Sequence, residues 1–200
     1  MKLQSTLLAL VTLAIFTLSA CDKEDDAKKN SFKYNQKEAE IGTAFGFAFG
    51  QTEVSGVYAV AMEFFEKSFT VHYVGGYPDS LSGKGDALLL TFLSEKETEI
   101  PTGEYTVKIS SAAPASFKID TDDETGLVVG YDAATNDDPA FIEITSGSVK
   151  VTKNGDDYEF TFNLSTNVNS TITGYYKGKP VIFSDKKKKS SVNNSRLPSR

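Results

Sequence analysis

The chain is short of the residues that most often carry chemistry. Its 200 residues include one cysteine, one histidine and no tryptophan. One cysteine excludes an intrachain disulfide, and one histidine with one thiol leaves too few ligands for zinc. After the N-terminus, no apolar run approaches the roughly 20 residues of a membrane-spanning helix. No Gly-x-Ser-x-Gly motif accompanies His72, which we expect to be a partly exposed strand residue, so the sequence predicts no enzyme.

The first twenty residues have the three parts of a secretory signal. Lys2 supplies the positive start, residues 7–18 form an apolar run broken only by threonines, and small residues precede Cys21. Leu18-Ser19-Ala20-Cys21 resembles the bacterial lipobox. That resemblance implies that a diacylglyceryl group is joined to Cys21 and that the chain is cut before it. We therefore expect residues 1–20 to be removed and the mature protein to be held to a membrane by lipid.

Two polar segments flank the expected domain. Residues 21–30 contain the lipidated cysteine and a charged tether with no apolar side chain larger than alanine. Lys23-Glu24-Asp25-Asp26 is similar to the acidic export signal of Bacteroidetes lipoproteins, which implies an outer-membrane lipoprotein on the cell surface. Residues 185–200 form a basic tail that we expect to be disordered. Residues 31–184 hold 22 acidic and 11 basic side chains, and this acidic balance argues against nucleic acid as a partner.

From Ser31 onward the apolar residues recur with a period of two, which indicates β-strands. The clearest example alternates from Val149 to Leu164 around Asn154-Gly155, and it predicts a hairpin whose two turn residues both have positive φ. Gly- and Pro-containing turn signals separate about ten short strands, and no amphipathic helix is convincing. The sequence therefore predicts a single all-β domain, either an antiparallel β-sandwich or a lipocalin-like β-barrel.

Two segments depart from the half-buried pattern. Between Thr43 and Gly50 one face is phenylalanine and the other is alanine and glycine. The small face requires close approach by a neighbouring backbone or a flat ligand, and structural packing is the preferred explanation. Ala87-Leu88-Leu89-Leu90 is apolar on both faces, which indicates a strand that is covered on both sides.

The C-terminal third resembles small Bacteroidetes surface lipoproteins of unassigned activity. The matching residues are Ser146-Gly147, the alternation from Tyr158 to Phe162, and Ile172-Thr173-Gly174-Tyr175-Tyr176-Lys177-Gly178. Pro101-Thr102-Gly103-Glu104-Tyr105 is similar to the segment that begins a strand in that group. The resemblance implies an all-β domain on the cell exterior and no particular activity.

Few residues are candidates for a site. Asp120, Asp122 and Glu124 have the alternate spacing of a calcium loop, although Thr125 and Tyr131 stand where an EF-hand needs Gly and Glu. A looser calcium site would add the carboxylates of Asp132, Asp137 and Asp138. Ser80, within Asp79-Ser80-Leu81, resembles the O-glycan acceptor of exported Bacteroidetes proteins.

These observations predict a non-enzymatic surface lipoprotein without a cofactor. A small apolar ligand in a barrel interior is the first expectation for its binding function, and a glycan or protein partner at the loop end is the second. A glycan platform would use Tyr73, Tyr77, Tyr175 and Tyr176, although tryptophan, the best stacking residue, is absent. The alternative is a structural or adhesin-type subunit that pairs with other proteins through a strand edge.

Overall fold

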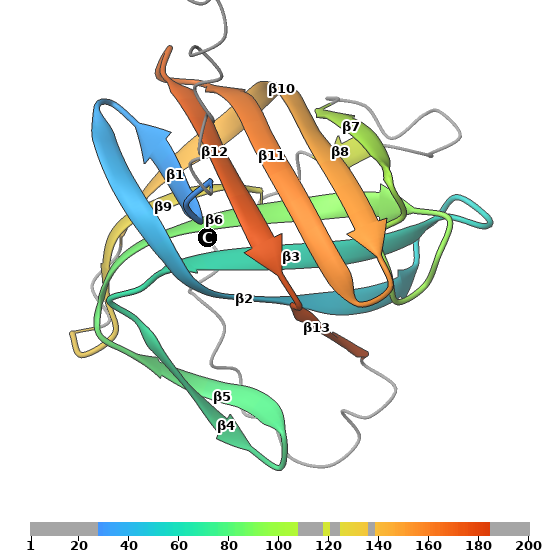
Figure 1. Ribbon diagram of the computed structural model, residues 1–200, viewed down its shortest axis with the longest axis horizontal. Helices are drawn as coiled ribbons and strands as arrows, with labels where there is room; N and C mark the ends of the chain where they lie inside the picture. The colour runs from blue at the N-terminus through green and yellow to red at the C-terminus, as the bar shows by residue number, and fades with distance from the viewer. Residues whose placement is uncertain (1–27, 108–117, 121–124, 136–138, 185–200) are drawn as a thin grey trace, which may run out of the picture.

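The chain folds as a closed β-barrel with additional strands (Figure 1). The computed structural model describes residues 28–107, 118–120, 125–135 and 139–184. Within these ranges no helix is long and apolar enough to cross a membrane. The strands are β1 (Ser31–Tyr34), β2 (Lys37–Gln51), β3 (Tyr58–Glu66), β4 (Thr70–Val74), β5 (Tyr77–Ser82), β6 (Lys84–Ser94), β7 (Gly103–Val107), β8 (Lys118–Asp120), β9 (Gly126–Asp132), β10 (Ala140–Asn154), β11 (Asp157–Thr166), β12 (Thr171–Gly178) and β13 (Val181–Ser184).

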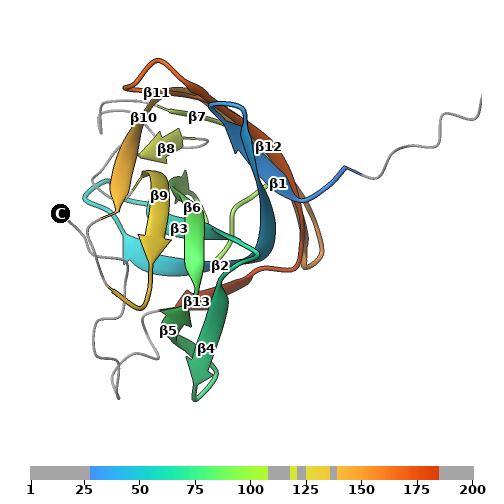
Figure 2. The ribbon, with the colours of Figure 1, turned by 90° about the vertical axis from the view of Figure 1, so that its left-hand side faces the viewer.

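Nine strands follow one another around the barrel in the order β1-β12-β11-β10-β7-β8-β6-β3-β2. The wall closes because β1 pairs with both β12 and β2, so that the first strand bridges the two ends of the sheet (Figure 2). A closed wall leaves much less free edge than an open sheet would, which is the usual way for a large antiparallel sheet to limit pairing with other chains.

Two places in the wall are shared by short strands. Between β10 and β6, β9 fills one end of the gap, whereas β7 and β8 fill the other. Along β2, β1 pairs with the first residues and β13 pairs with residues 45–48. The β13–β2 and β7–β8 pairings are parallel, whereas the other strand pairs of the described chain are antiparallel.

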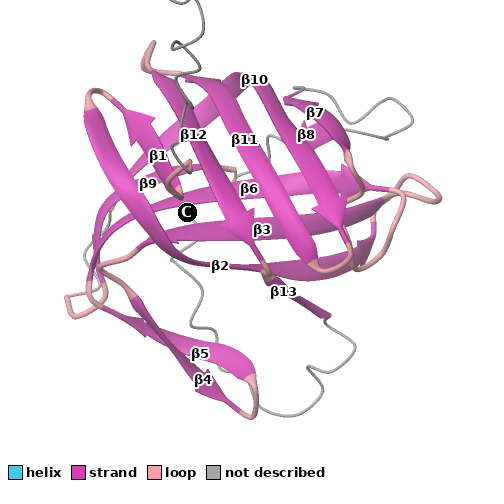
Figure 3. Ribbon diagram, viewed as in Figure 1, coloured by secondary structure: helices cyan, strands magenta, loops and turns pink. Residues whose placement is uncertain are grey.

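The predicted all-β fold is confirmed, and the barrel replaces the sandwich alternative (Figure 3). Two strands, β2 and β10, are longer than expected, with 15 residues each. In β2, β-bulges at Ile41/Thr43 and Ala48/Gly50 bend the strand around the barrel without ending it. Two strands, β1 and β5, were not expected. The Pro-Asp pair at residues 78 and 79, a turn signal in sequence, lies within β5.

The barrel interior is filled by a large apolar cluster with an aromatic centre. The ring of Phe64 lies 5.2 Å from that of Phe160, 5.0 Å from Phe162 and 5.4 Å from Tyr176, all in edge-to-face arrangements. In the segment from Thr43 to Gly50, the face of β2 opposite the phenylalanines is small: at Gly46, an added Cβ would lie 2.6 Å from Met62 Sδ and 2.7 Å from a backbone oxygen of β3. Packing against β3 therefore explains the small face, as preferred from the sequence.

A second apolar cluster lies on the outside of the barrel. Phe45 of β2 stacks on Phe65 of β3 with ring centroids 5.3 Å apart, and β13 covers them with Phe183. Ala87 and Leu89 of β6 join this outer cluster, while Leu88 and Leu90 face the interior. The prediction that β6 is covered on both sides is confirmed. The aromatic face of β2 thus points away from the barrel centre.

The β10–β11 hairpin forms where the sequence predicts it, one residue further along. Asn154 pairs with Asp157, so the two loop residues are Gly155 and Asp156. Only Gly155 has positive φ, at 62°, as a type II′ turn requires of its first central residue. The expectation of positive φ at Asn154 is therefore wrong. A turn with positive φ at both residues occurs instead between β1 and β2, at Asn35 (44°) and Gln36 (67°).

Candidate functional site

The β4–β5 hairpin is the one part of the described chain that forms a sheet of its own outside the barrel. It projects from the barrel wall, as Figures 1 and 2 show. The Gly75-Gly76 turn, with φ values of 60° and 82°, reverses the chain at its tip. Val71, Tyr77 and Leu81 pack on the outer cluster, and Tyr77 contacts Phe183 with centroids 5.2 Å apart. Tyr77 follows the turn directly, so these contacts hold one face of the hairpin against the outer cluster as far as its tip, while Tyr73 and Val74 of β4 stay exposed.

The tip carries apolar side chains that face water. Tyr73 is 52% exposed and Val74 is 61% exposed. No Asp, Glu, Lys or Arg occurs from Ser68 to Pro78, in a domain that is otherwise rich in charge. Large exposed apolar residues gathered on one projecting element are a sign of an interaction surface.

The two outer edges of the hairpin differ in their protection against pairing. Strand β5 carries Pro78, which lacks an N–H, and Asp79, the extra residue of a β-bulge opposite His72 and Tyr73. The proline and the bulge both make the outer edge of β5 less able to pair with another strand. Strand β4 reads Thr70-Val71-His72-Tyr73-Val74, has high β-propensity and no formal charge, and pairs with β5 alone among the described residues.

His72 lies exposed on β4, as the sequence predicts. Its Nε2 is 2.9 Å from Ser82 Oγ across the hairpin. In the described part of the chain no carboxylate contacts the other ring nitrogen, so nothing orients the imidazole as a catalytic base. The pair therefore acts as a cross-strand contact that helps to hold β4 beside β5.

A buried polar cluster occupies one end of the barrel interior. Asp86 of β6 is fully buried and accepts hydrogen bonds from Tyr34 Oη (2.8 Å) and from the backbone N–H of Gly130 (2.8 Å). Lys37 Nζ donates to the same carboxylate and lies 3.8 Å from Glu66 Oε2. Glu66 accepts the backbone N–H of Asp86 at 3.0 Å. Each of these inward-facing side chains comes from the end of a different strand.

The local backbone explains why a carboxylate is tolerated there. A β-bulge in β9 places Gly130, with φ of 69°, opposite Asp86 and turns its N–H toward the carboxylate. Burial, and then the hydrogen bond to Asp86, raise the pKa of Tyr34 well above its usual value, so the phenol stays a donor. Every donor faces an acceptor, and the ammonium of Lys37 faces two carboxylates. The cluster therefore fits a structural role as the polar cap of the core.

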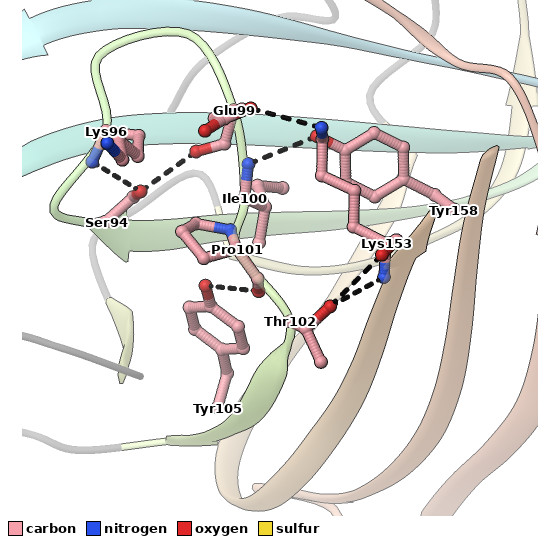
Figure 4. A network of polar contacts seen from close by, with 9 residues as sticks. All are labelled: Ser94, Lys96, Glu99, Ile100, Pro101, Thr102, Tyr105, Lys153 and Tyr158. Atoms are coloured by element: carbon pink, nitrogen blue, oxygen red, sulfur yellow. Dashed lines mark hydrogen bonds and ion pairs between the residues drawn. The ribbon is translucent and has the colours of Figure 1, made fainter. Parts of the chain in front are cut away.

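The opposite end of the barrel is closed by the loop between β6 and β7. Ile100 at its centre is fully buried in the inner cluster, and its N–H donates to Tyr158 Oη at 3.4 Å (Figure 4). The Glu99–Lys153 ion pair, at 3.1 Å, ties the loop to β10, and Tyr105 Oη donates to the carbonyl of Pro101 at 2.9 Å. Asp86 and Ser94, at the two ends of β6, are about 25 Å apart along the strand. Both barrel ends are thus occupied by the chain's own side chains.

The predicted calcium residues lie only partly in the described chain. Asp120 ends β8, opposite Thr91 of β6, whereas Asp122, Glu124, Asp137 and Asp138 lie outside the described residues. Asp132 pairs with Lys84, and its carboxylate lies 3.6 Å from Lys84 Nζ. Lys84 and Thr91, the β6 partners of Asp132 and Asp120, are seven positions apart, so the two aspartates are roughly 20 Å apart. Asp132 therefore does not join Asp120. Among described residues, no three metal-ligating side chains are grouped to hold an ion.

The remaining predicted residues are dispersed. Ser80 lies half-buried in β5, opposite His72. The four tyrosines proposed as a glycan platform do not share a surface, because Tyr176 is buried in the barrel interior while Tyr73 stands on the hairpin tip. Cys21 lies outside the described residues. Sequence reasoning missed the Asp86 cluster, for which a lone acid directly before β6's apolar run was the available signal. It also missed the second strand of the projecting hairpin.

No family model, curated protein or solved structure matches this chain.

Proposed function

We propose that this protein is a lipid-anchored, non-enzymatic binding protein that contacts a protein partner through the β4 edge of the β4–β5 hairpin. The observation that carries the proposal is the asymmetry of the hairpin. Pro78 and the Asp79 bulge protect β5, whereas β4 presents five uncharged residues and two exposed apolar side chains. An exposed, uncharged edge is the surface that β-strand addition uses, with backbone hydrogen bonds giving affinity and side chains giving selectivity.

The barrel then serves as a scaffold. Ring contacts such as Phe64 with Phe160 and Phe92 with Tyr105, at 5.2 and 5.1 Å, occupy its centre. A small apolar ligand in the interior would have to displace side chains that are already packed together. The expectation of an interior ligand therefore has less support than the sequence-based alternative of edge pairing.

The proposed anchor on Cys21 agrees with a contact role. Ten residues, 21–30, separate the lipid from the first strand, and a chain of that length spans at most about 35 Å. The domain would therefore stay close to the membrane surface, where anchored molecules meet one another at high local concentration. Even a weak strand edge is then sufficient for association.

Photo-cross-linking in the cells that make the protein tests the proposal. A photoreactive amino acid at Tyr73 should give discrete adducts, and the same probe at Val168, an exposed valine between β11 and β12, should not. Adding Val74→Lys should weaken the Tyr73 adducts, because the charge flanks the pairing edge. Equal adducts at both sites, or none at Tyr73, would remove β4 as the contact surface.

A further inference from the structure

The sequence of β4 is complementary to itself when it runs antiparallel. An antiparallel pair formed about a twofold axis through His72 places Val71 opposite Tyr73 of the second copy, twice, and Thr70 opposite Val74. A β-branched residue opposite an aromatic residue is one of the stabilising cross-strand combinations. No pair brings two formal charges together, although the domain as a whole is acidic.

The register is also determined by the length of the strand. In an antiparallel pair, directly opposite residues have their side chains on the same face of the sheet, whereas neighbouring residues of one strand have theirs on opposite faces. A twofold axis must therefore lie midway between two copies of the same residue. An axis at Val71 or Tyr73 would pair only three residues of β4 with one another. The axis at His72 pairs all five, from Thr70 to Val74. The isologous arrangement then uses the same surface on both partners, as symmetric dimers do.

From this complementarity, and resting on the proposed function of the β4 edge, we infer that the partner of the hairpin is a second copy of this chain. Two β4–β5 hairpins join through β4 into a four-stranded antiparallel sheet, with Pro78 and the Asp79 bulge on both outer edges. The devices that blunt β5 stop further addition, so association ends at the dimer. Two barrels are thereby linked through elements that project from them (Figure 2).

Disulfide cross-linking tests both the partner and the register. Directly opposite residues of an antiparallel pair have Cα atoms about 4.5–5.5 Å apart, within the range of about 4.4–6.8 Å that a disulfide accepts. His72 faces itself across the axis, so His72→Cys should give a disulfide dimer on mild oxidation of the full-length chain in membranes. The wild-type chain, whose single cysteine is Cys21, is the background.

Two further variants distinguish the predicted pairing from random collision. Val74→Cys faces Thr70 of the second copy, so it should cross-link poorly alone and efficiently when Thr70→Cys is added. Val168→Cys places an equally exposed cysteine on another element, and it should cross-link no more than wild type. We expect at least a tenfold excess of dimer for His72→Cys over Val168→Cys. Near-ultraviolet circular dichroism of each purified variant shows that the hairpin substitutions leave the barrel folded.

The outcomes separate this inference from the proposed function. Equal cross-linking of His72→Cys, Val74→Cys and Val168→Cys overturns the dimer, as does the absence of a His72→Cys dimer. If Tyr73 photo-adducts then contain another protein, the β4 edge still binds a partner but the partner is not this chain. If those adducts are absent too, both the inference and the proposed function fail.

Discussion

Replacing Asp86 by alanine tests whether the polar cluster holds the barrel end together. The side chain is fully buried and accepts from Tyr34, Gly130 and Lys37 at once. Alanine removes the shared acceptor and leaves all three donors in place. The tyrosine and the glycine N–H are then stranded next to the apolar core, where water cannot fully replace the carboxylate.

The expected loss can be worked from those contacts. Each buried donor left without an acceptor lowers the free energy of unfolding by about 1–3 kcal/mol. Removing one member of a buried ion pair lowers it by about 3–5 kcal/mol. The charge contribution must be reduced, because the Lys37 side chain is 47% exposed and can turn to water or to Glu66. We expect Asp86→Ala to lower the free energy of unfolding by about 3 kcal/mol.

Urea unfolding, followed by circular dichroism, measures the effect. Asp157→Ala, which removes a half-exposed carboxylate 3.7 Å from Lys179, is the matched control and should change stability by less than about 0.5 kcal/mol. Tyr34→Phe removes one stranded donor, so adding it to Asp86→Ala should cost less than the sum of the two single changes. A loss below about 1 kcal/mol for Asp86→Ala, or strict additivity with Tyr34→Phe, would refute the reasoning.

Three other predictions concern the turn, the buried tyrosines and the anchor. Gly155→Val should destabilise the protein by about 1–2 kcal/mol and Gly155→Asn by clearly less, because only the backbone at positive φ is strained; equal melting temperatures would contradict this. Burial raises the pKa of Tyr34 and Tyr105, so the folded state keeps phenol protons that the unfolded state loses near pH 10. Stability should therefore be full below pH 10 and fall as the pH rises above it, with a shallower fall in Tyr105→Phe; a constant urea midpoint across this range would show otherwise. Cys21→Ser should move the protein from the detergent phase to the aqueous phase, and unchanged partitioning would place the anchor elsewhere.

The alternation of apolar residues was sufficient to predict much of this fold. Period-two patterns, of which the alternation from Val149 to Leu164 is the clearest, identified most strands, because a strand buries alternate side chains whatever its partners are. The doubly apolar run at Leu88 and Leu89 correctly indicated a strand covered on both sides. Gly155 identified a hairpin, although its register was one residue off, because Asn-Gly and Gly-Asp turns share a glycine at positive φ.

Only the tertiary structure decided which apolar face belongs to which core. The alternation shows that Phe45 and Phe47 share a face but not which way that face points. In the structure they lie outside the barrel in the cluster with Phe183 and the hairpin, since β13 returns from the far end of the chain to cover them. Closure of the barrel depends on β1, whose four residues carry too little pattern to predict a strand. The partners of Asp86 come from β1, β2, β3 and β9, and no local pattern can predict contacts between strands that distant. Local periodicity determined the strands themselves, and the pairing of remote strands determined the barrel, its buried carboxylate and the free edge of β4.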